Sequence, residues 1–435
     1  MSTQNIFLEN VTAVTLWPAS VRRGVNLRVS GESISGLGQV LSPEPGDEVV
    51  DLHGALVMPG LVVGHHHLYS ALARGMPFPS ADPPKNFHET LQKIWWRLDR
   101  ALDPETNYLS ALAGALDAAR FGVTAIVDHH ASPSAVPGSL DEISRGIGEV
   151  GLRAILCYEV SDRDGQEVAK AGIEENLRFQ RSRARDPLLR GMIGAHASFT
   201  IGDTTLDALA RACADTGAGL HMHLLEDAVD RSMSVDLHGA DPVTRLAQRG
   251  MLSDRTLLVH GVHLTPEEIR ALGEAGVFLA HNARSNMNNR VGAAPIASFG
   301  DRVVLGTDGI DGDILAEARA AFFRGREHAS PVDLGLVTKM LTGSNALLET
   351  YFGARFGRLE EGAVADLVVL DYDPPTPLEA DNLAGHLGFA WGAHLVRSVM
   401  VAGSFVYRDR AYTRLDPAEA LGRTRAGASA LWRKL

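Results

Sequence analysis

Lysine is scarce in this chain. Its 435 residues include only five, at Lys85, Lys93, Lys170, Lys339 and Lys434, and arginine supplies the rest of the 41 basic side chains. Acidic residues number 53 and are dispersed, so the formal net charge is −12 without any long acidic run. A nucleic-acid or anionic-membrane partner is therefore disfavoured.

Cysteine and long apolar runs are scarce as well. The two cysteines, Cys157 and Cys213, lie far apart and form no CxxC pair, which favours buried thiols in a reducing compartment. No apolar run is long enough to span a bilayer, and the first fourteen residues have neither the basic nor the apolar region of a signal peptide. We therefore expect a cytoplasmic protein that has no membrane partner.

Short apolar runs alternate with segments of helical pattern from Met58 to about residue 325. The eight runs are 61–64, 124–128, 153–160, 192–195, 219–224, 256–260, 277–281 and 303–308. Nearly continuous apolar strands indicate a parallel sheet, and eight strand–helix repeats predict an α/β fold of the (β/α)8 TIM-barrel type. A doubly wound open sheet would need a glycine-rich turn after the first strand, where three histidines stand instead.

The two ends of the chain have strand character. Residues 1–57 and 358–415 predict a small β-sandwich built from both termini, and residues 416–435 predict a closing amphipathic helix. The hydrolase-type barrel would then span residues 58–357.

Most of the eight runs end in a histidine or an aspartate. These strand-end residues are His65, His66 and His67, His196, His221 and His223, His260, His281 and Asp308. The carboxyl ends of the strands of a TIM barrel carry its active site, so these side chains are expected to converge. His129 and His130 stand at the end of the second run, and the sequence does not indicate a function for them.

The spacing of the histidines predicts a metal site. His65 and His67 are two residues apart on a strand, so they point to the same side and can reach one ion, together with a strand-five histidine and Asp308. His221 and His223 both fit strand five. Glu226, three residues after His223, favours His223, since an acid there can transfer protons at the metal-bound water. Three imidazoles and a carboxylate suit Zn²⁺, or alternatively Fe²⁺.

Several motifs together resemble a known family. MPGLVVGHHH, HMHLLE, LLVHGVHL, LAHNARSN, VLGTDG and GRLEEGAVADLVVL look like the cytosine deaminase, guanine deaminase and atrazine chlorohydrolase branch of the amidohydrolases. HHHLYSALARGM, IWWRLDRAL, IVDHHASP, HNARSNMNN and DNLAGH are similar to the SsnA-type aminohydrolases, which are linked to purine breakdown.

The resemblance implies roles for individual residues. The ligands would be His65, His67, His223 and Asp308; Glu226 would shuttle protons, His260 would steady the attacking hydroxide or polarise the substrate, Asp308 would also take the proton of the water, and His196 would face the substrate. That branch usually has proline where Arg284 stands, so Arg284 either marks an anionic substrate group or forms a salt bridge at the rim. Such barrels usually associate, which implies a homodimer or a larger homo-oligomer.

A single metal is expected for a chemical reason. Some amidohydrolases bind two metals through a carboxylated lysine at the end of strand four, but here that strand ends at His196. No lysine lies between Lys170 and Lys339, and Lys170 falls in a helical stretch.

The expected substrate is a small N-heterocycle. Tyr69, the Trp95-Trp96 pair and Phe199 could stack on it, although Trp95 and Trp96 could equally pack a helix. Deamination of a purine- or pyrimidine-like amine is the favoured reaction, and hydrolytic ring opening of a cyclic amide is the alternative.

Two alternatives come from other classes of protein. A non-catalytic metal-binding protein would lack the acid/base pair, whereas Glu226 and His260 are both present here. A dehydrogenase would need a GxGxxG turn after the first strand, where the three histidines stand instead.

Overall fold

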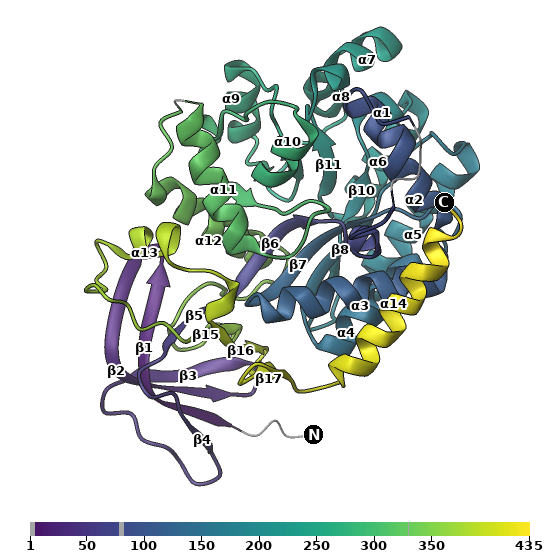
Figure 1. The fold of residues 1–435 in the computed structure, drawn as a ribbon. Coiled ribbons are helices and arrows are strands. Elements are labelled where there is room, and N and C mark those ends of the chain that lie inside the picture. Colours follow the sequence, from purple (N-terminus) through teal and green to yellow (C-terminus); the bar gives the residue numbers. More distant parts are fainter. Residues whose placement is uncertain (1–4, 78–81, 329) are drawn as a thin grey trace.

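Two parallel sheets lie at the centre of the computed structural model, which describes residues 5–77, 82–328 and 330–435 (Figure 1). One sheet has the strand order β6-β7-β8-β9 and the other the order β10-β11-β12-β13-β14. The strands are β6 (Leu61–His66), β7 (Val123–His130), β8 (Arg153–Tyr158), β9 (Leu189–Gly191), β10 (Ile193–Ala195), β11 (Leu220–Leu224), β12 (Leu257–His260), β13 (Phe278–His281) and β14 (Val303–Leu305). All neighbouring strands in both sheets run parallel, which confirms the predicted α/β class.

The pairing does not form the continuous eight-stranded ring that the sequence predicted. The fourth predicted run is divided at Met192: β9 pairs with β8, whereas β10 pairs with β11. Among the described residues, isolated bridges join the two sheets, between His66 and Asp308 and between Val160 and Ala195. The ring is open at two places: between β9 and β10, where one short segment changes partner halfway along its length, and between β14 and β6.

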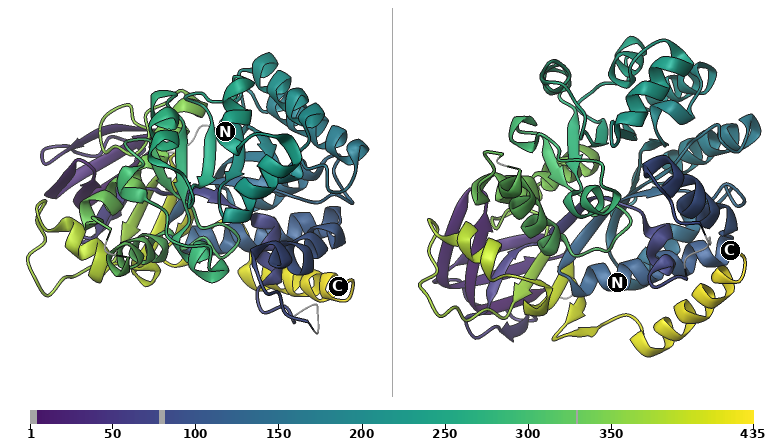
Figure 2. Two further views of the ribbon diagram at one scale, coloured as in Figure 1. Left: turned by 90° about the horizontal axis from the view of Figure 1, so that it is seen from above. Right: turned by 45° about the horizontal axis from the view of Figure 1, so that its top comes forward.

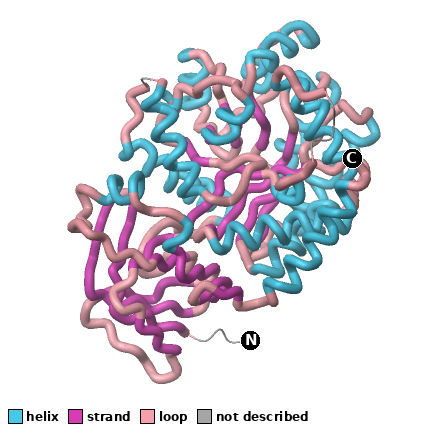
Figure 3. Tube along the Cα trace, viewed as in Figure 1, coloured by secondary structure: helices cyan, strands magenta, loops and turns pink. Residues whose placement is uncertain are grey.

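Side chains of the parallel strands alternate between two apolar layers. Val62, Ile155 and Val259 pack in an interior cluster, whereas Val63 and Leu156 pack towards the surrounding helices. Every residue of β6, β7 and β8 is buried, as expected for a sheet covered on both faces. Figure 3 shows the strands enclosed by helices. These helices are α3 (Pro104–Arg120), α4 (Ser139–Val150), α5 (Gln166–Ser182), α6 (Asp203–Thr216), α7 (Ala228–His238), α8 (Pro242–Gln248), α9 (Pro266–Glu274), α10 (Ala283–Asn289), α11 (Ile314–Glu327) and α12 (Leu334–Phe352).

A run of short helical turns follows β6. They are η1 (Leu68–Ala73), α1 (Phe87–Thr90), the π-helical η2 (Leu91–Trp95) and α2 (Trp96–Ala101). This run places Tyr69, Trp95 and Trp96 beside the ends of the parallel strands.

Strands from both ends of the chain share a single nine-stranded sheet beside the parallel sheets (Figure 2). Its order is β18-β17-β16-β15-β5-β1-β2-β3, with β4 paired to β1. The strands are β1 (Ile6–Leu16), β2 (Ala19–Ser30), β3 (Ser33–Gly38), β4 (Glu48–Asp51), β5 (Leu56–Pro59), β15 (Leu367–Leu370), β16 (Val396–Val401), β17 (Ser404–Arg408) and β18 (Ala411–Tyr412). Residues 1–4 of the predicted N-terminal segment lie outside the described residues.

The two termini meet where β5 pairs antiparallel with β15, from Leu56 opposite Leu370 to Pro59 opposite Leu367. The remaining helices belong to the C-terminal part: α13 (Leu383–Phe389) lies near this sheet, and α14 (Pro417–Trp432) runs along α3 (Figure 1). The Trp432 indole donates a hydrogen bond to the Leu72 carbonyl, 2.8 Å away. No helix among the described residues is both long and apolar enough to cross a bilayer.

A buried ion pair connects the terminal sheet to the parallel strands. The Arg153 guanidinium, at the start of β8, donates two hydrogen bonds to the Asp366 carboxylate, just before β15, at 2.9 and 3.1 Å. Both side chains are almost fully buried, and Asp366 also accepts a hydrogen bond from the Ala402 amide. Removal of one partner would leave the other as an uncompensated buried charge.

We therefore expect Asp366→Ala to lower the free energy of unfolding by about 3–5 kcal/mol. Asp409→Ala is the matched control, because the Asp409 carboxylate pairs with Arg397 but is 58% exposed, and exposed pairs contribute about 0–1 kcal/mol. Denaturant unfolding of both variants checks this. Equal losses in the two would show that the Arg153 pair does not stabilise the junction.

Candidate active site

The polar side chains predicted from the sequence gather at the carboxyl ends of the parallel strands. His65 lies in β6 and His67 directly follows it, while His223 lies in β11 and His260 ends β12. Asp308 stands three residues beyond β14. Because the carboxyl ends of parallel strands face one edge of the sheet, their side chains meet there.

Four of these residues bring their ligand atoms within 4.8 Å of one another: His65, His67, His223 and Asp308. The His67 Nε2 atom lies 3.0 Å from Asp308 Oδ1 and 3.1 Å from His223 Nε2, and His65 Nε2 lies 3.6 Å from Asp308 Oδ1. His65 Nε2 is buried and has no hydrogen-bond partner among the described residues. Three nitrogens and an oxygen directed at one point suit Zn²⁺ or Fe²⁺.

Hydrogen bonds behind the rings determine which nitrogen each histidine presents. His67 Nδ1 donates to the His129 carbonyl at 2.6 Å, and His223 Nδ1 donates to the His196 carbonyl at 3.0 Å. The Nδ1 atoms of both rings therefore carry a proton, and their Nε2 atoms face the cluster. Such partners fix the tautomer of a metal-binding imidazole.

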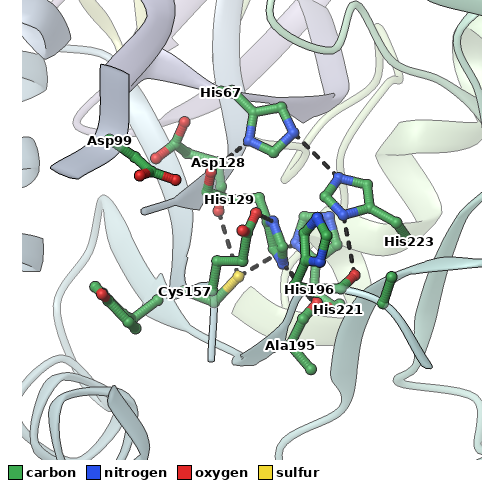
Figure 4. A network of polar contacts seen from close by, with 12 residues as sticks. His67, Asp99, Asp128, His129, Cys157, Ala195, His196, His221 and His223 are labelled. Carbon is green, nitrogen blue, oxygen red and sulfur yellow. Dashed lines mark hydrogen bonds and ion pairs between the residues drawn. The ribbon is translucent and has the colours of Figure 1, made fainter. Parts of the chain in front are cut away.

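His221, the other strand-five candidate, lies behind His65 rather than in the cluster. Its Nε2 atom is 2.8 Å from His65 Nδ1, and its Nδ1 atom is 3.4 Å from the Cys157 sulfur (Figure 4). The geometry thus distinguishes the two histidines that the HxH spacing alone left equivalent.

Two of the three histidines of the cluster are neutral, and the third is influenced by Asp308. Burial lowers the pKa of His65 and of His223 well below the usual value, so both rings are neutral. Burial alone would also lower the pKa of His67, but the Asp308 carboxylate raises it to about 9. A proton therefore lies between His67 and Asp308 in the metal-free chain, and metal binding would release it.

A second group of possible ligands adjoins the first, formed by His67, His129, Glu159 and His223. His129 Nε2 donates to the carbonyls of Ala195 and His221, both at 3.1 Å, and its Nδ1 lies 3.1 Å from Glu159 Oε2. Burial would raise the pKa of Glu159, but His196, His129 and Arg163 hold it well below its usual range. The Nε2 atom of His129 is thus bound to two backbone carbonyls and is not available to a metal.

The residues that the sequence predicts as acid/base groups lie on the other side of the cluster. His260 Nε2 is 3.3 Å from Glu226 Oε2 and 3.9 Å from Asp308 Oδ2. Burial raises the pKa of Glu226 to about 7, although the nearby His260 lowers it. A carboxyl group with this pKa can accept and donate a proton near neutral pH, as general acid/base catalysis requires.

A cavity of about 280 Å³ opens onto this cluster. Tyr69, Trp95, His196 and Phe199, which the sequence singled out as substrate contacts, all line it, as does Trp96. Of the acidic side chains, it is lined by Asp99, Glu159, Glu226, Asp230 and Asp308. No lysine or arginine among the described residues lines it.

Arg284 is not part of the cavity lining. Its guanidinium forms ion pairs with Glu317, at 2.6 Å, and with Asp311, at 2.8 Å. The Glu317 side chain is fully buried. Of the two alternatives that the sequence left open, the structure shows the salt bridge.

Sequence reasoning missed several residues of the site. Glu159 directly follows β8, so the strand-end rule could have found it. Ser285 and Asn289 stand in the HNARSNMNN motif, which was noted without assigning them roles. Asp99 and Asp230 stand in helices and gave no local signal.

A cluster of imidazoles and a carboxylate beside a buried glutamate, at the carboxyl edge of parallel strands, is typical of metal-dependent hydrolases of the α/β class. The amidohydrolase family model matches residues 56–406, and the chain belongs to that family.

Similar proteins include several deaminases. The 5-methylthioadenosine/S-adenosylhomocysteine deaminase of Haloarcula marismortui is 32% identical over 384 residues, which cover 85% of each chain. The 5′-deoxyadenosine deaminase of Methanosarcina mazei is 29% identical over 443 residues, or 98% of each chain.

Solved structures share the fold. An adenosine deaminase from Xanthomonas campestris with bound zinc gives a TM-score of 0.87 at 24% identity and covers 99% of both chains. Atrazine chlorohydrolase from Arthrobacter aurescens complexed with zinc gives 0.82 at 22% identity, covering 97% of this chain and all of that one.

The site geometry predicts one metal ion per chain, lost from the His223→Ala protein because that change removes a ligand. His53→Ala is the control, since the His53 side chain is 77% exposed in the terminal sheet region. Elemental analysis of the purified proteins provides the measurement. Two tightly bound metals per chain, or full occupancy in His223→Ala, would contradict the assignment.

Proposed function

We propose that this chain is a mononuclear metal-dependent aminohydrolase that removes an amino group from a purine-like heterocycle by hydrolysis. The observation that carries the proposal is the position of Glu226, a buried carboxyl with a pKa of about 7, directly beside the histidine–aspartate cluster. The deaminase names of the two curated relatives support the reaction type.

The chain's own residues suit one metal. His65, His67 and His223 would bind it through Nε2, and Asp308 through its carboxylate, with zinc expected and ferrous iron the alternative. A metal bound there supplies a water acidic enough to ionise near neutral pH. A second ion lacks its bridging ligand, because His196 stands where a carboxylated lysine would be needed and Lys170 lies in α5.

Protons then move through side chains at the cavity. Asp308 accepts the proton of the attacking water, and Glu226 gives a proton to the leaving nitrogen. His260, whose Nε2 atom faces both carboxyl groups, holds the attacking oxygen or the substituent on the reacting carbon. The carbon–nitrogen bond breaks with its electron pair on nitrogen, and ammonia leaves.

The cavity suits a flat ring. Tyr69, Trp95 and Phe199 present aromatic surfaces, which stack well on heterocycles. His196 Nδ1 contacts the Thr200 hydroxyl at 2.8 Å, so its Nε2 atom is available to a ring nitrogen or carbonyl of the substrate. The three aromatic side chains would orient the ring and His196 would bind its edge.

The proposal also covers the domains of the protein, its oligomeric state and its localisation. The two bridges between the parallel sheets support a (β/α)8 barrel over residues 58–357. One apolar cluster contains both N-terminal and C-terminal strand residues, which supports a sandwich from residues 1–57 and 358–415, closed by the helix in 416–435. We propose a cytoplasmic homo-oligomer that acts in purine catabolism.

Glu226→Gln should keep its metal but lower turnover by about 100- to 10,000-fold, because the amide cannot carry the proton. Glu274→Gln, at an exposed position in α9, is the control. Ammonia release from a panel of aminopurines and aminopyrimidines measures turnover, and metal analysis accompanies it. Full activity in Glu226→Gln, or loss of its metal, would contradict the role of Glu226 in proton transfer.

The charge of the cavity predicts discrimination against phosphates. Since acidic side chains line it without a lysine or arginine among the described residues, a 5′-phosphate would meet like charges. We expect kcat/KM for an aminopurine nucleoside to exceed that for its 5′-monophosphate by about tenfold or more. Comparable values for the two compounds would show that an unrecognised cationic group serves the cavity.

A further inference from the structure

Helix α10 contacts each member of the acid/base set. Three of its seven residues, all buried or half-buried, make one hydrogen bond each to a different group of the set. The pairs are Ser285 Oγ donating to Asp308 Oδ2, His260 Nδ1 donating to Asn286 Oδ1 at 2.8 Å, and Asn289 Nδ2 donating to Glu226 Oε1 at 3.0 Å. A single helix of two turns therefore holds three side chains that come from three different strand ends.

Asn289 has one orientation that satisfies all its neighbours. Its Oδ1 atom accepts a hydrogen bond from Asn288 Nδ2 at 3.1 Å, so its Nδ2 atom faces Glu226. Ser285 lies on the same face of the helix, four residues earlier, and its Oγ atom is 3.4 Å from Asn289 Nδ2. Asn288 and Ser285 thus both hold the Asn289 side chain in the orientation that contacts Glu226.

These bonds distinguish the two oxygens of Glu226. Oε1 accepts the Asn289 N–H and is therefore the oxygen without a proton. Oε2 lies 3.3 Å from His260 Nε2, and His260 already uses its Nδ1 hydrogen on Asn286. Oε2 is therefore the oxygen of Glu226 that can carry a proton, and it faces the His260 ring.

We propose that Asn289 is a positioning residue that assigns proton transfer to Oε2 of Glu226, an inference that rests on the proposed deamination. In that step Oε2 gives its proton to the leaving nitrogen while the carbon–nitrogen bond breaks heterolytically, and Asp308 takes the proton of the attacking water. Nothing is oxidised or reduced. Without Asn289, either oxygen of Glu226 can hold the proton, and the carboxyl group can turn away from the leaving group.

A pair of substrates that differ in the leaving group tests this role. Adenosine loses an amine, which needs a proton, whereas 6-chloropurine riboside loses chloride, which does not. Asn289→Leu and the isosteric Asn289→Asp both lack the donor. We expect kcat for adenosine to fall about tenfold or more in both variants, while kcat for the chloro compound and both KM values change less than about threefold.

Met287→Gln is the matched control, since Met287 lies in the same helix, is 44% exposed and does not line the cavity. It should leave both rates unchanged. Equal losses on the two substrates in the Asn289 variants would indicate a merely structural role and overturn the proposal, as would full activity on both.

A second measurement needs no substrate. In crystal structures of the metal-loaded proteins, Asn289→Leu should move the Glu226 carboxyl group away from His260, whereas Met287→Gln should not. An unchanged Glu226 in Asn289→Leu would overturn the inference. If the unsubstituted protein turns over neither riboside, the proposed purine substrate is wrong, and the crystal structures alone decide the role of Asn289.

Discussion

The site depends on imidazole rings that each have one nitrogen already bound to the protein. His67 and His223 donate their Nδ1 hydrogens to the backbone carbonyls of His129 and His196, in and next to the neighbouring strands β7 and β10. Neither ring can rotate without breaking a buried hydrogen bond, which is costly. The Nε2 atoms therefore converge even without a metal, and the strand ends set the spacing of the ligands.

This arrangement also determines which carboxyl group can shuttle protons. Around the cavity, despite burial, His196, His129 and Arg163 hold the pKa of Glu159 well below its usual range. Burial raises the pKa of Asp99, of Asp230 and of Glu226 to about 7. Glu226 differs from the other two in position, because its carboxyl group lies within 4.8 Å of His260 and Asp308 and accepts a hydrogen bond from Asn289. A carboxyl group that can gain or lose a proton near neutral pH therefore lies where the proposed chemistry needs it.

Local patterns in the sequence predicted the strands, and they also selected candidate ligands that the structure brings close together. Alternation along a strand placed His65 and His67 on one side, and each predicted run overlaps a strand of the structure. The break of the ring at Met192 could not be predicted from the sequence, because an apolar run has the same pattern whichever neighbouring strand it pairs with. Asp99 and Asn289 reach the site only through the packing of helices, so no periodicity or strand-end rule indicates them.

Backbone conformation differs between the two edges of the parallel sheets. At the amino ends, turns such as those at Gly151 and Gly276 adopt positive φ, which glycine allows without strain. At the carboxyl ends, Leu225, His260 and Asp308 adopt φ of 50°, 75° and 52°. Positive φ disfavours such residues by about 1–3 kcal/mol each.

Glycine cannot relieve that strain at the site. His260 and Asp308 must keep their side chains, and Leu225 is fully buried, with its amide bonded to Asp230 at 2.6 Å in the turn that directs Glu226 towards His260. The surrounding hydrogen bonds therefore have to maintain these conformations, as the bond from the Asp308 amide to the His65 carbonyl does at 3.2 Å. Backbone strain is therefore concentrated at the carboxyl edge of the parallel sheets, which also carries the reactive groups. The same positive φ values direct those side chains towards one point.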